Sequence, residues 1–213
     1  VRELVLRGAH VTVIPTASAL KFVGMPTWEA ISRNPVTADL FDGVAEVRHV
    51  ALGQQADLII LAPATAHTLA SVAGGFAGDL LGTTILASSA PLVIAPAMHT
   101  EMWENPAVRA NVELLRARGA LIVGPESGAL TGDDRGPGRM SEPADIADVA
   151  LGALVPKALR GKRVLISVGG TREYLDPVRF IGNRSSGEMG ISLARAALAR
   201  GAEVTIVHAH LEA

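Results

Sequence analysis

Residues 92–106, LVIAPAMHTEMWENP, hold the densest group of side chains in this chain that could carry out chemistry. An apolar run with β-branched residues predicts a buried parallel strand that ends at Pro96, because proline cannot donate to a ladder. Met98 and His99 follow, and ligands of open α/β sheets bind beyond the carboxyl ends of strands. The residues alone leave two interpretations, a ligand-binding loop or a connection whose methionines and tryptophan only pack the core.

Two further apolar runs end at a proline and lead into hydroxyl side chains. Residues 11–14 are a predicted strand followed by Thr16 and Ser18, and residues 56–61 are a predicted strand followed by Thr65. A hydroxyl at a helix start caps the first amides, and the free amides there also attract anions such as phosphate. A plain cap and an anion site both remain open.

A third group of small residues follows a predicted strand over residues 164–170. Glycines directly after a strand, and polar residues at a helix start, are typical of phosphate cradles, although a structural turn has the same composition. The residues of the two candidate cradles are Gly169 and Gly170, then Asn183, Ser185, Ser186 and Gly187.

These segments alternate with helical patterns, which indicates βαβ units and a parallel sheet. We predict an α/β fold, with a doubly wound parallel sheet of Rossmann-like or flavodoxin-like type in residues 1–155. Residues 161–213 are predicted to form the first βαβ unit of a second Rossmann-like domain. Within the first of these domains, residues 124–143 are rich in Gly, Pro, Ser and Asp, which predicts a mobile loop of a length that is usually either a lid or disordered.

Composition excludes several classes of protein. A formal net charge of −2 argues against a nucleic-acid binder, which usually shows a basic excess. The chain has no cysteine, so it has no disulfide, no Cys-ligated zinc and no thiol nucleophile, and no metal site is predicted. No apolar run approaches the roughly 18 residues that span a bilayer, so we expect a soluble, cytoplasmic protein without a membrane partner.

The segment PAMHTEMW resembles the PAMN-x-x-M-W motif of the flavin-dependent cysteine decarboxylases. The chain around it resembles the bifunctional bacterial proteins that join phosphopantothenoylcysteine decarboxylase to phosphopantothenate-cysteine ligase in coenzyme A synthesis. The resemblance implies FMN-dependent decarboxylation of 4′-phosphopantothenoylcysteine, ligation that uses CTP and Mg²⁺, small-molecule substrates and a homo-oligomer built on trimers. It does not reach both ends of the family protein, so a first strand with its Gly-rich turn and most of the ligase domain are expected to be missing.

The resemblance also implies roles for single residues. His49 lies on a predicted short helix, where a lone histidine is more often structural, but it matches the catalytic histidine of the family motif H-I-x-L. Arg139 lies in G-P-G-R-M, the end of a flap that clamps the substrate. The implied substrate-binding residues are Met98, His99 and Arg139, the implied FMN-binding residues are Thr16, Ser18, Thr65 and Thr83, and the two glycine-rich cradles above would bind the ligase nucleotide.

Several positions depart from the family pattern. His67 and His99 replace asparagines, and Glu188 replaces a lysine. The family flap carries a cysteine that donates a proton, and its replacement here stays open among Thr131, Asp133, Asp134 and water.

Two other functions remain as alternatives. One is a non-catalytic flavoprotein regulatory subunit of the same fold, which fits the missing flap cysteine but not the presence of His49. The other is a simple NAD-binding protein, which is disfavoured because no G-x-G-x-x-G with an acidic partner occurs.

Overall fold

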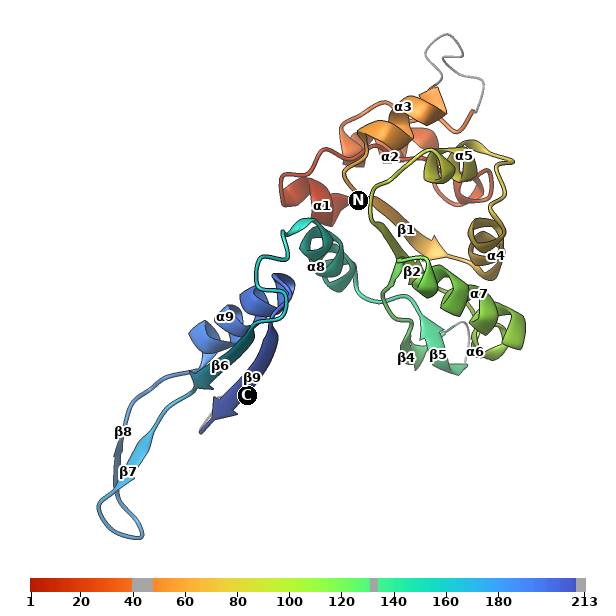
Figure 1. Cartoon of the computed structure of the whole chain (residues 1–213). Coiled ribbons are helices and arrows are strands. Elements are labelled where there is room, and N and C mark those ends of the chain that lie inside the picture. The colour runs from red at the N-terminus through yellow and green to blue at the C-terminus, as the bar shows by residue number, and fades with distance from the viewer. Residues whose placement is uncertain (40–47, 131–133, 210–213) are drawn as a thin grey trace. The chain divides into compact units, whose positions relative to one another are not determined.

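The computed structural model describes residues 1–39, 48–130 and 134–209, and these form two compact units, Val1–Leu154 and Val155–Ala213 (Figure 1). Unit 1 is built on a parallel sheet of three strands in the order β1-β2-β3, which confirms the predicted α/β class. The strands are β1 (Ile59–Ala64), β2 (Leu92–Pro96) and β3 (Leu121–Ile122). The helices after the first two strands are α4 (Ala66–Gly74), α5 (Leu80–Leu86), α6 (Thr100–Glu104) and α7 (Pro106–Ala117).

Strand β2 is the centre of unit 1 and is covered on both faces. Ile94 packs with residues of α4, α6 and α7, whereas its neighbours Val93 and Ala95 pack with Ile146 and Ala150 of α8 (Pro143–Leu154). Successive side chains of a strand point to opposite faces, so a continuous apolar run is what such a strand requires. The expected burial of this segment is confirmed.

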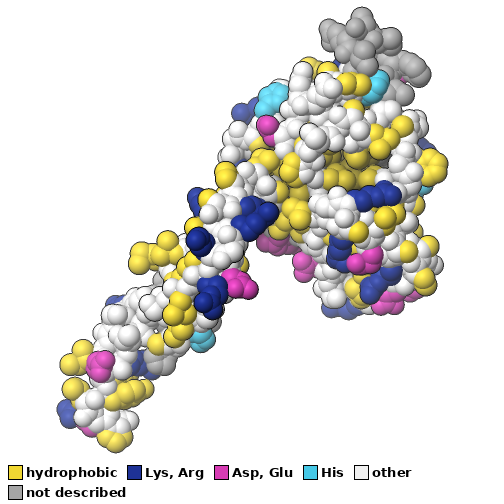
Figure 2. All heavy atoms as spheres, viewed as in Figure 1, with side chains coloured by type: hydrophobic (Ala, Val, Ile, Leu, Met, Phe, Trp, Pro, Cys, Tyr) yellow, Lys and Arg dark blue, Asp and Glu magenta, His cyan; other side chains and the backbone are white. Residues whose placement is uncertain are grey.

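The other strands of the sheet are less enclosed. Ile59 and Ile60 of β1 are only half-buried, and Figure 2 shows hydrophobic side chains gathered in a recess of unit 1 over this strand. Strand β1 pairs with β2 on one side, through the register Ile60 to Val93 and Leu61 to Ile94.

The predicted strand over residues 11–14 is wrong. The structure assigns no strand there, and among the described residues no ladder includes these positions. A β-strand needs backbone hydrogen bonds to an adjacent strand. Here the Val11 carbonyl oxygen accepts instead from a side chain, Asn34 Nδ2, at 2.9 Å. The helical elements of this region are α1 (Arg2–Leu6), η1 (Ala19–Lys21), α2 (Met25–Ser32) and α3 (Arg48–Gln55).

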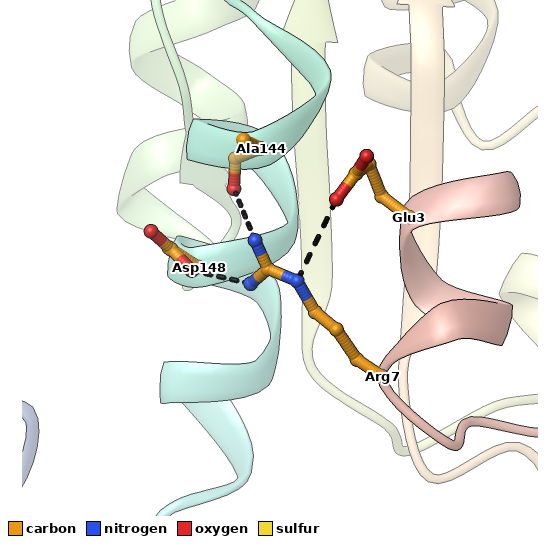
Figure 3. A network of polar contacts seen from close by, with 4 residues as sticks. All are labelled: Glu3, Arg7, Ala144 and Asp148. Atoms are coloured by element: carbon orange, nitrogen blue, oxygen red, sulfur yellow. Dashed lines mark hydrogen bonds and ion pairs between the residues drawn. The ribbon is translucent and has the colours of Figure 1, made fainter.

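Arg7 connects the N-terminal helix to α8. Helix α1 has no fully buried side chain, since Leu4 and Val5 are only half-buried, so polar contacts add to its attachment. The Arg7 guanidinium pairs with Asp148, donates to the Ala144 carbonyl oxygen at 3.4 Å, and lies 3.8 Å from Glu3 Oε2 (Figure 3).

We expect Arg7→Met to lower the free energy of unfolding by about 0.5–1 kcal/mol, because the pairs are exposed and therefore weak. The larger effect should be local, as faster hydrogen exchange of the α1 amides. Arg2→Met, an exposed position on the same helix, is the control. Unchanged exchange in α1 after the Arg7 substitution would show that another contact holds this helix.

Residues 126–139 contain a hairpin where a loop was expected. Strands β4 (Glu126–Ala129) and β5 (Arg135–Arg139) pair in antiparallel fashion, with Gly128 opposite Gly136. The loop prediction is therefore wrong for both strands, because a composition of Gly and Pro does not reveal a ladder that tertiary contacts stabilise. The mobility of this segment stays a prediction.

Unit 2 contains a βαβ unit and a second hairpin. Strands β6 (Arg163–Val168) and β9 (Glu203–His208) pair in parallel, and α9 (Glu188–Ala199) connects them and packs on β6. The antiparallel strands β7 (Arg172–Tyr174) and β8 (Phe180–Gly182) are inserted before α9. None of the helices described in either unit is long and apolar enough to cross a membrane.

Candidate functional site

The carboxyl ends of β1 and β2 open onto one edge of the sheet. Ala64 pairs with Pro96, and the Ala97 amide donates to the Ala64 carbonyl oxygen at 3.0 Å. Thr65 and Met98, which follow these two positions, therefore leave the sheet at the same edge. The structure thus brings together the two proline-ended segments that the sequence singled out.

Thr65 is the N-cap of α4. Its hydroxyl accepts a hydrogen bond from the Thr68 amide at 3.3 Å, and its carbonyl oxygen accepts from the Leu69 amide at 2.9 Å. The first amides of a helix have no intrahelical acceptor, so those of Ala66 and His67 face outward from the helix start. Thr65 is exposed, and its hydroxyl also lies 3.1 Å from the Thr68 hydroxyl, in a hydrogen bond in which either group can be the donor.

The β4–β5 hairpin is seated on the turn after β2. The Met98 amide donates to the Gly138 carbonyl oxygen at 3.0 Å. Gly138 has φ +145°, and a Cβ there would overlap the Met98 carbonyl oxygen. A Cβ at Gly136 would in the same way overlap the Thr100 hydroxyl. At Gly138 both the backbone overlap and the positive φ require glycine, whereas at Gly136 a Cβ would force the Thr100 side chain to move, so both contacts help to seat the hairpin.

A contact between two polar side chains crosses the same junction. His99 Nδ1 lies 3.6 Å from Asp134 Oδ2, and His99 is the N-cap of α6. Arg139, at the end of β5, pairs with Glu142. Met98 and His99 therefore lie against the hairpin that carries Arg139, while Thr131 and Asp133 fall outside the described residues. Residue spacing alone does not indicate the His99–Asp134 contact or the glycine contacts of the hairpin, because both are tertiary contacts.

His49 is not part of this cluster within one chain. It lies near the start of α3, and α3 packs closely on α5, where a Cβ at Gly53 would lie 2.6 Å from the Thr84 carbonyl oxygen. Helix α3 and the β4–β5 hairpin lie at opposite ends of unit 1 (Figure 1). No hydrogen bond or ion pair joins His49 to Met98 or His99 in the part of the chain that the structure describes.

The other three hydroxyls expected to hold FMN, those of Thr16, Ser18 and Thr83, differ in the hydrogen bonds they already make. Thr16 Oγ1 accepts from the Ala19 amide at 3.1 Å, and Ser18 is exposed without a side-chain cap bond. Thr83 Oγ1 lies 2.8 Å from the Asp79 carbonyl oxygen and 3.1 Å from the Leu80 carbonyl oxygen. Its single hydrogen is donated to these backbone acceptors. Thr83 is therefore left with acceptor capacity only.

Asp79 is a structural residue that the sequence analysis did not single out. Its carboxylate caps α5 by accepting from the Gly82 amide at 2.7 Å. An aspartate directly before an apolar helical run is a recognisable N-cap signal. The cap orients the start of α5, the helix that also carries Thr83.

Thr65 and the first amides of α4 are neutral polar groups at the carboxyl edge, whereas Thr16 and Ser18 carry hydroxyls on a separate segment around η1. Such donors hold phosphate and sugar hydroxyls without a compensating cation. Among the described residues no group of three or more His, Asp or Glu is arranged as a metal site.

The two candidate phosphate cradles of unit 2, at residues 169–170 and 183–187, lie next to each other. A Cβ at Gly170 would lie 2.9 Å from Asn183 Oδ1, and the Ser185 amide donates to that same oxygen at 3.4 Å. The Glu188 amide donates to Ser186 Oγ at 3.4 Å, and Gly187, with φ +82°, is the N-cap of α9. The six small residues therefore converge at the carboxyl end of β6, as Gly169 and Gly170 directly follow that strand.

The hairpin between the two cradles has an ordered tip. The Arg179 and Val178 amides and the Arg179 guanidinium donate to the Asp176 carboxylate, at 2.7, 2.9 and 2.5 Å. These hydrogen bonds lower the pKa of Asp176, with the Arg179 amide as the largest cause. At the base of the hairpin, the Arg172 guanidinium lies 4.5 Å from the centre of the Phe180 ring.

Comparison with known sequences gives a match to each unit. Residues 1–154 match the family described as Flavoprotein, and residues 159–213 match the DNA/pantothenate metabolism flavoprotein C-terminal domain. The coenzyme A biosynthesis bifunctional protein CoaBC of Mycolicibacterium smegmatis is 52% identical over 212 residues, which are 97% of this chain and 51% of that protein. The Escherichia coli protein of the same name is 47% identical over 210 residues, 97% of this chain and 52% of that protein. The chain spans about half the length of the curated relatives it matches.

Solved structures resemble the chain over about the length of unit 1. The FMN-dependent cysteine decarboxylase SpaF has a TM-score of 0.61 at 34% identity, covering 72% of this chain and 87% of its own. A PPC decarboxylase mutant complexed with pantothenoylaminoethenethiol has a TM-score of 0.64 at 29% identity, covering 70% and 85%. The FMN binding protein AtHal3 has a TM-score of 0.61 at 29% identity, covering 70% and 83%. These findings confirm the resemblance and the Rossmann-like, flavodoxin-like fold predicted from the sequence.

Proposed function

This chain belongs to the flavoprotein family, and on that premise we propose that residues 1–155 form an FMN-dependent decarboxylase of 4′-phosphopantothenoylcysteine. The product is 4′-phosphopantetheine, an intermediate of coenzyme A synthesis, and the reaction takes place in the cytoplasm. Support comes from the named relatives at 47–52% identity and from the similarity to a PPC decarboxylase structure.

The observation that carries the proposal is the seat of the β4–β5 hairpin at the carboxyl edge of the sheet. The hairpin backbone reaches Met98 through Gly138, on the edge from which Thr65 also departs. A hairpin held over this edge can cover a bound substrate and exclude water from it. Arg139, Met98 and His99 are the proposed substrate-binding residues, and the half-exposed His99 can reach a substrate carboxylate.

When FMN is bound, it supplies two-electron oxidation of the cysteine thiol, which makes loss of CO₂ feasible. In this proposal Thr65, Thr16 and Ser18 hold its phosphate and ribityl chain through the hydroxyls described above. Thr83 contributes less, because its hydroxyl hydrogen is committed to the α5 backbone. His49 transfers the proton at the cysteine end of the substrate.

We also propose that the enzyme is a homo-oligomer built on trimers. Within one chain His49 and the Met98–His99 turn lie on separate elements at opposite ends of unit 1 (Figure 1). A site that needs both therefore requires His49 from a second copy. Sedimentation of the FMN-loaded chain tests this assembly, since a monomer with full turnover would exclude a shared site.

Residues 161–213 are proposed to be the N-terminal part of a ligase domain that couples cysteine to 4′-phosphopantothenate with CTP and Mg²⁺. The match to the C-terminal domain of such flavoproteins supports this, as does the division of the chain at Leu154. The nucleotide would lie against Gly169, Gly170 and Gly187, and the polar side chains of Asn183, Ser185 and Ser186 would contact it or the acyl intermediate.

Two measurements on the FMN-loaded chain test the decarboxylase. A flavin absorbance titration gives FMN binding, and release of CO₂ from 4′-phosphopantothenoylcysteine gives turnover. Both are expected, and turnover without FMN is not. Binding without turnover would favour the alternative, a non-catalytic flavoprotein, and failure to bind FMN would exclude both.

We expect Thr65→Val to raise the dissociation constant of FMN by about ten- to a hundredfold, because a hydrogen bond to a charged phosphate contributes roughly 1.5–3 kcal/mol. Thr83→Val, which removes a hydroxyl already bonded to the helix backbone, is the matched control and should change the constant by less than about threefold. Equal effects from the two substitutions would contradict the assignment of Thr65.

A further inference from the structure

The contact between His99 and Asp134 joins two segments that are each fixed by their backbones. The His99 carbonyl oxygen accepts from the Met102 and Trp103 amides at 3.1 and 3.0 Å, so His99 begins α6 in a set position. The Asp134 carbonyl oxygen accepts from the Leu130 amide at 2.8 Å, which closes the hairpin. The glycine contacts at Gly136 and Gly138 keep these two segments together.

The two side chains meet through particular atoms. Nδ1 of His99 faces Oδ2 of Asp134 at 3.6 Å, and the side chains are 45% and 69% exposed. An ionised carboxylate is an acceptor only, so its charge favours a hydrogen on the ring nitrogen that faces it, although 3.6 Å is longer than a hydrogen bond. Nε2, on the far side of the ring, is then the nitrogen left for a ligand. The second partner of an imidazole sets its tautomer and its orientation in the same way around metals and in catalytic triads.

We propose that Asp134 is a positioning residue for His99: it holds the hydrogen on Nδ1 and aims Nε2 at the substrate. The inference rests on the proposed function, which puts the carboxylate of the substrate's cysteine at His99. With the ring protonated, Nε2–H donates to that carboxylate, and Asp134 balances the charge on the other side. The hairpin therefore does more than cover the site, because one of its side chains orients a substrate-binding group.

The tautomer can be measured without any turnover. In the FMN-loaded chain labelled with ¹⁵N-histidine, the His99 ring signals are assigned by their loss in His99→Gln. At a pH where the ring is neutral, wild type should show the Nδ1–H form, and Asp134→Ala should shift His99 toward the Nε2–H form. Glu113→Ala, which removes an exposed carboxylate on α7, should leave the signals unchanged. The same His99 tautomer in wild type and Asp134→Ala would overturn the proposal.

Kinetics then test whether the orientation is used. Asp134→Ala should raise KM for 4′-phosphopantothenoylcysteine by roughly fivefold, with a smaller change in kcat, as expected for a half-exposed pair that acts on binding. In a His99→Gln background the same substitution should have no further effect, because its target is gone. An equal effect in both backgrounds would overturn the proposal. A wild-type chain that binds FMN but releases no CO₂ would refute the proposed function instead, and the ring signals would still decide the role of Asp134.

Discussion

His49→Asn is expected to abolish CO₂ release while FMN remains bound. Asparagine keeps a polar side chain of similar size but cannot take up or release a proton near neutral pH, and general acid–base catalysis typically contributes about 10²–10⁴-fold. The turnover number of the FMN-loaded variant should therefore fall by at least about a hundredfold. CO₂ release and the flavin absorbance spectrum, recorded on the same sample, check both halves of this expectation.

His10→Asn is the matched control, since His10 is exposed and lies outside the proposed site. Turnover of His49→Asn within about threefold of wild type, under roughly 1 kcal/mol of barrier, would contradict the catalytic role. Loss of FMN together with activity would instead assign His49 a structural role, in line with the close packing of α3 on α5.

Gly138→Ala should unseat the hairpin and remove most of the decarboxylase activity. The new Cβ would overlap the Met98 carbonyl oxygen, and φ +145° is a conformation that side chains rarely permit. The substitution should lower the free energy of unfolding by about 2–4 kcal/mol, or release the hairpin locally at a smaller global cost. Urea denaturation measures the first outcome, and hydrogen exchange at the Met98 amide measures the second.

The control for this substitution is Gly152→Ala in α8, where a Cβ would meet nothing within 4 Å. Alanine is favoured over glycine in a helix interior, so this variant should be unchanged or about 0.5–1 kcal/mol more stable. A Gly138→Ala protein with wild-type stability, Met98 exchange and turnover would show that the hairpin needs no glycine seat.

Local sequence patterns predicted the elements that depend on local chemistry. The apolar run of β2 was predicted correctly. Asn-Pro is another local signal of this kind, since Asn105 caps α7 by accepting from the Ala107 amide at 2.9 Å. Residues 11–14 have the same kind of apolar pattern, yet they are not a strand. The difference is a pairing neighbour, which no window of sequence contains.

The site was predictable only as a set of segments. The sequence placed Thr65 and Met98 after two separate predicted strands, and the structure brings both to one edge because parallel strands present their carboxyl ends together. The glycine contacts and the His99–Asp134 pair depend on how a hairpin folds back across that edge. Thr83 shows that residue type alone can also mislead. A threonine hydroxyl can bind a ligand, but this one donates its hydrogen to the backbone at the start of its own helix.

The central position of β2 also affects how often different parts of unit 1 are expected to open. Its backbone is bonded to β1 and to β3, and Val93, Ile94 and Ala95 are completely buried. Amides of such a strand open only when the whole unit unfolds, whereas a hairpin held at one seat opens far more often. We therefore expect the Met98–His99 turn to exchange its amides more slowly than the β4–β5 hairpin that covers it. If the proposed function holds, substrate would enter and leave through openings of the hairpin while Met98 and His99 keep their places.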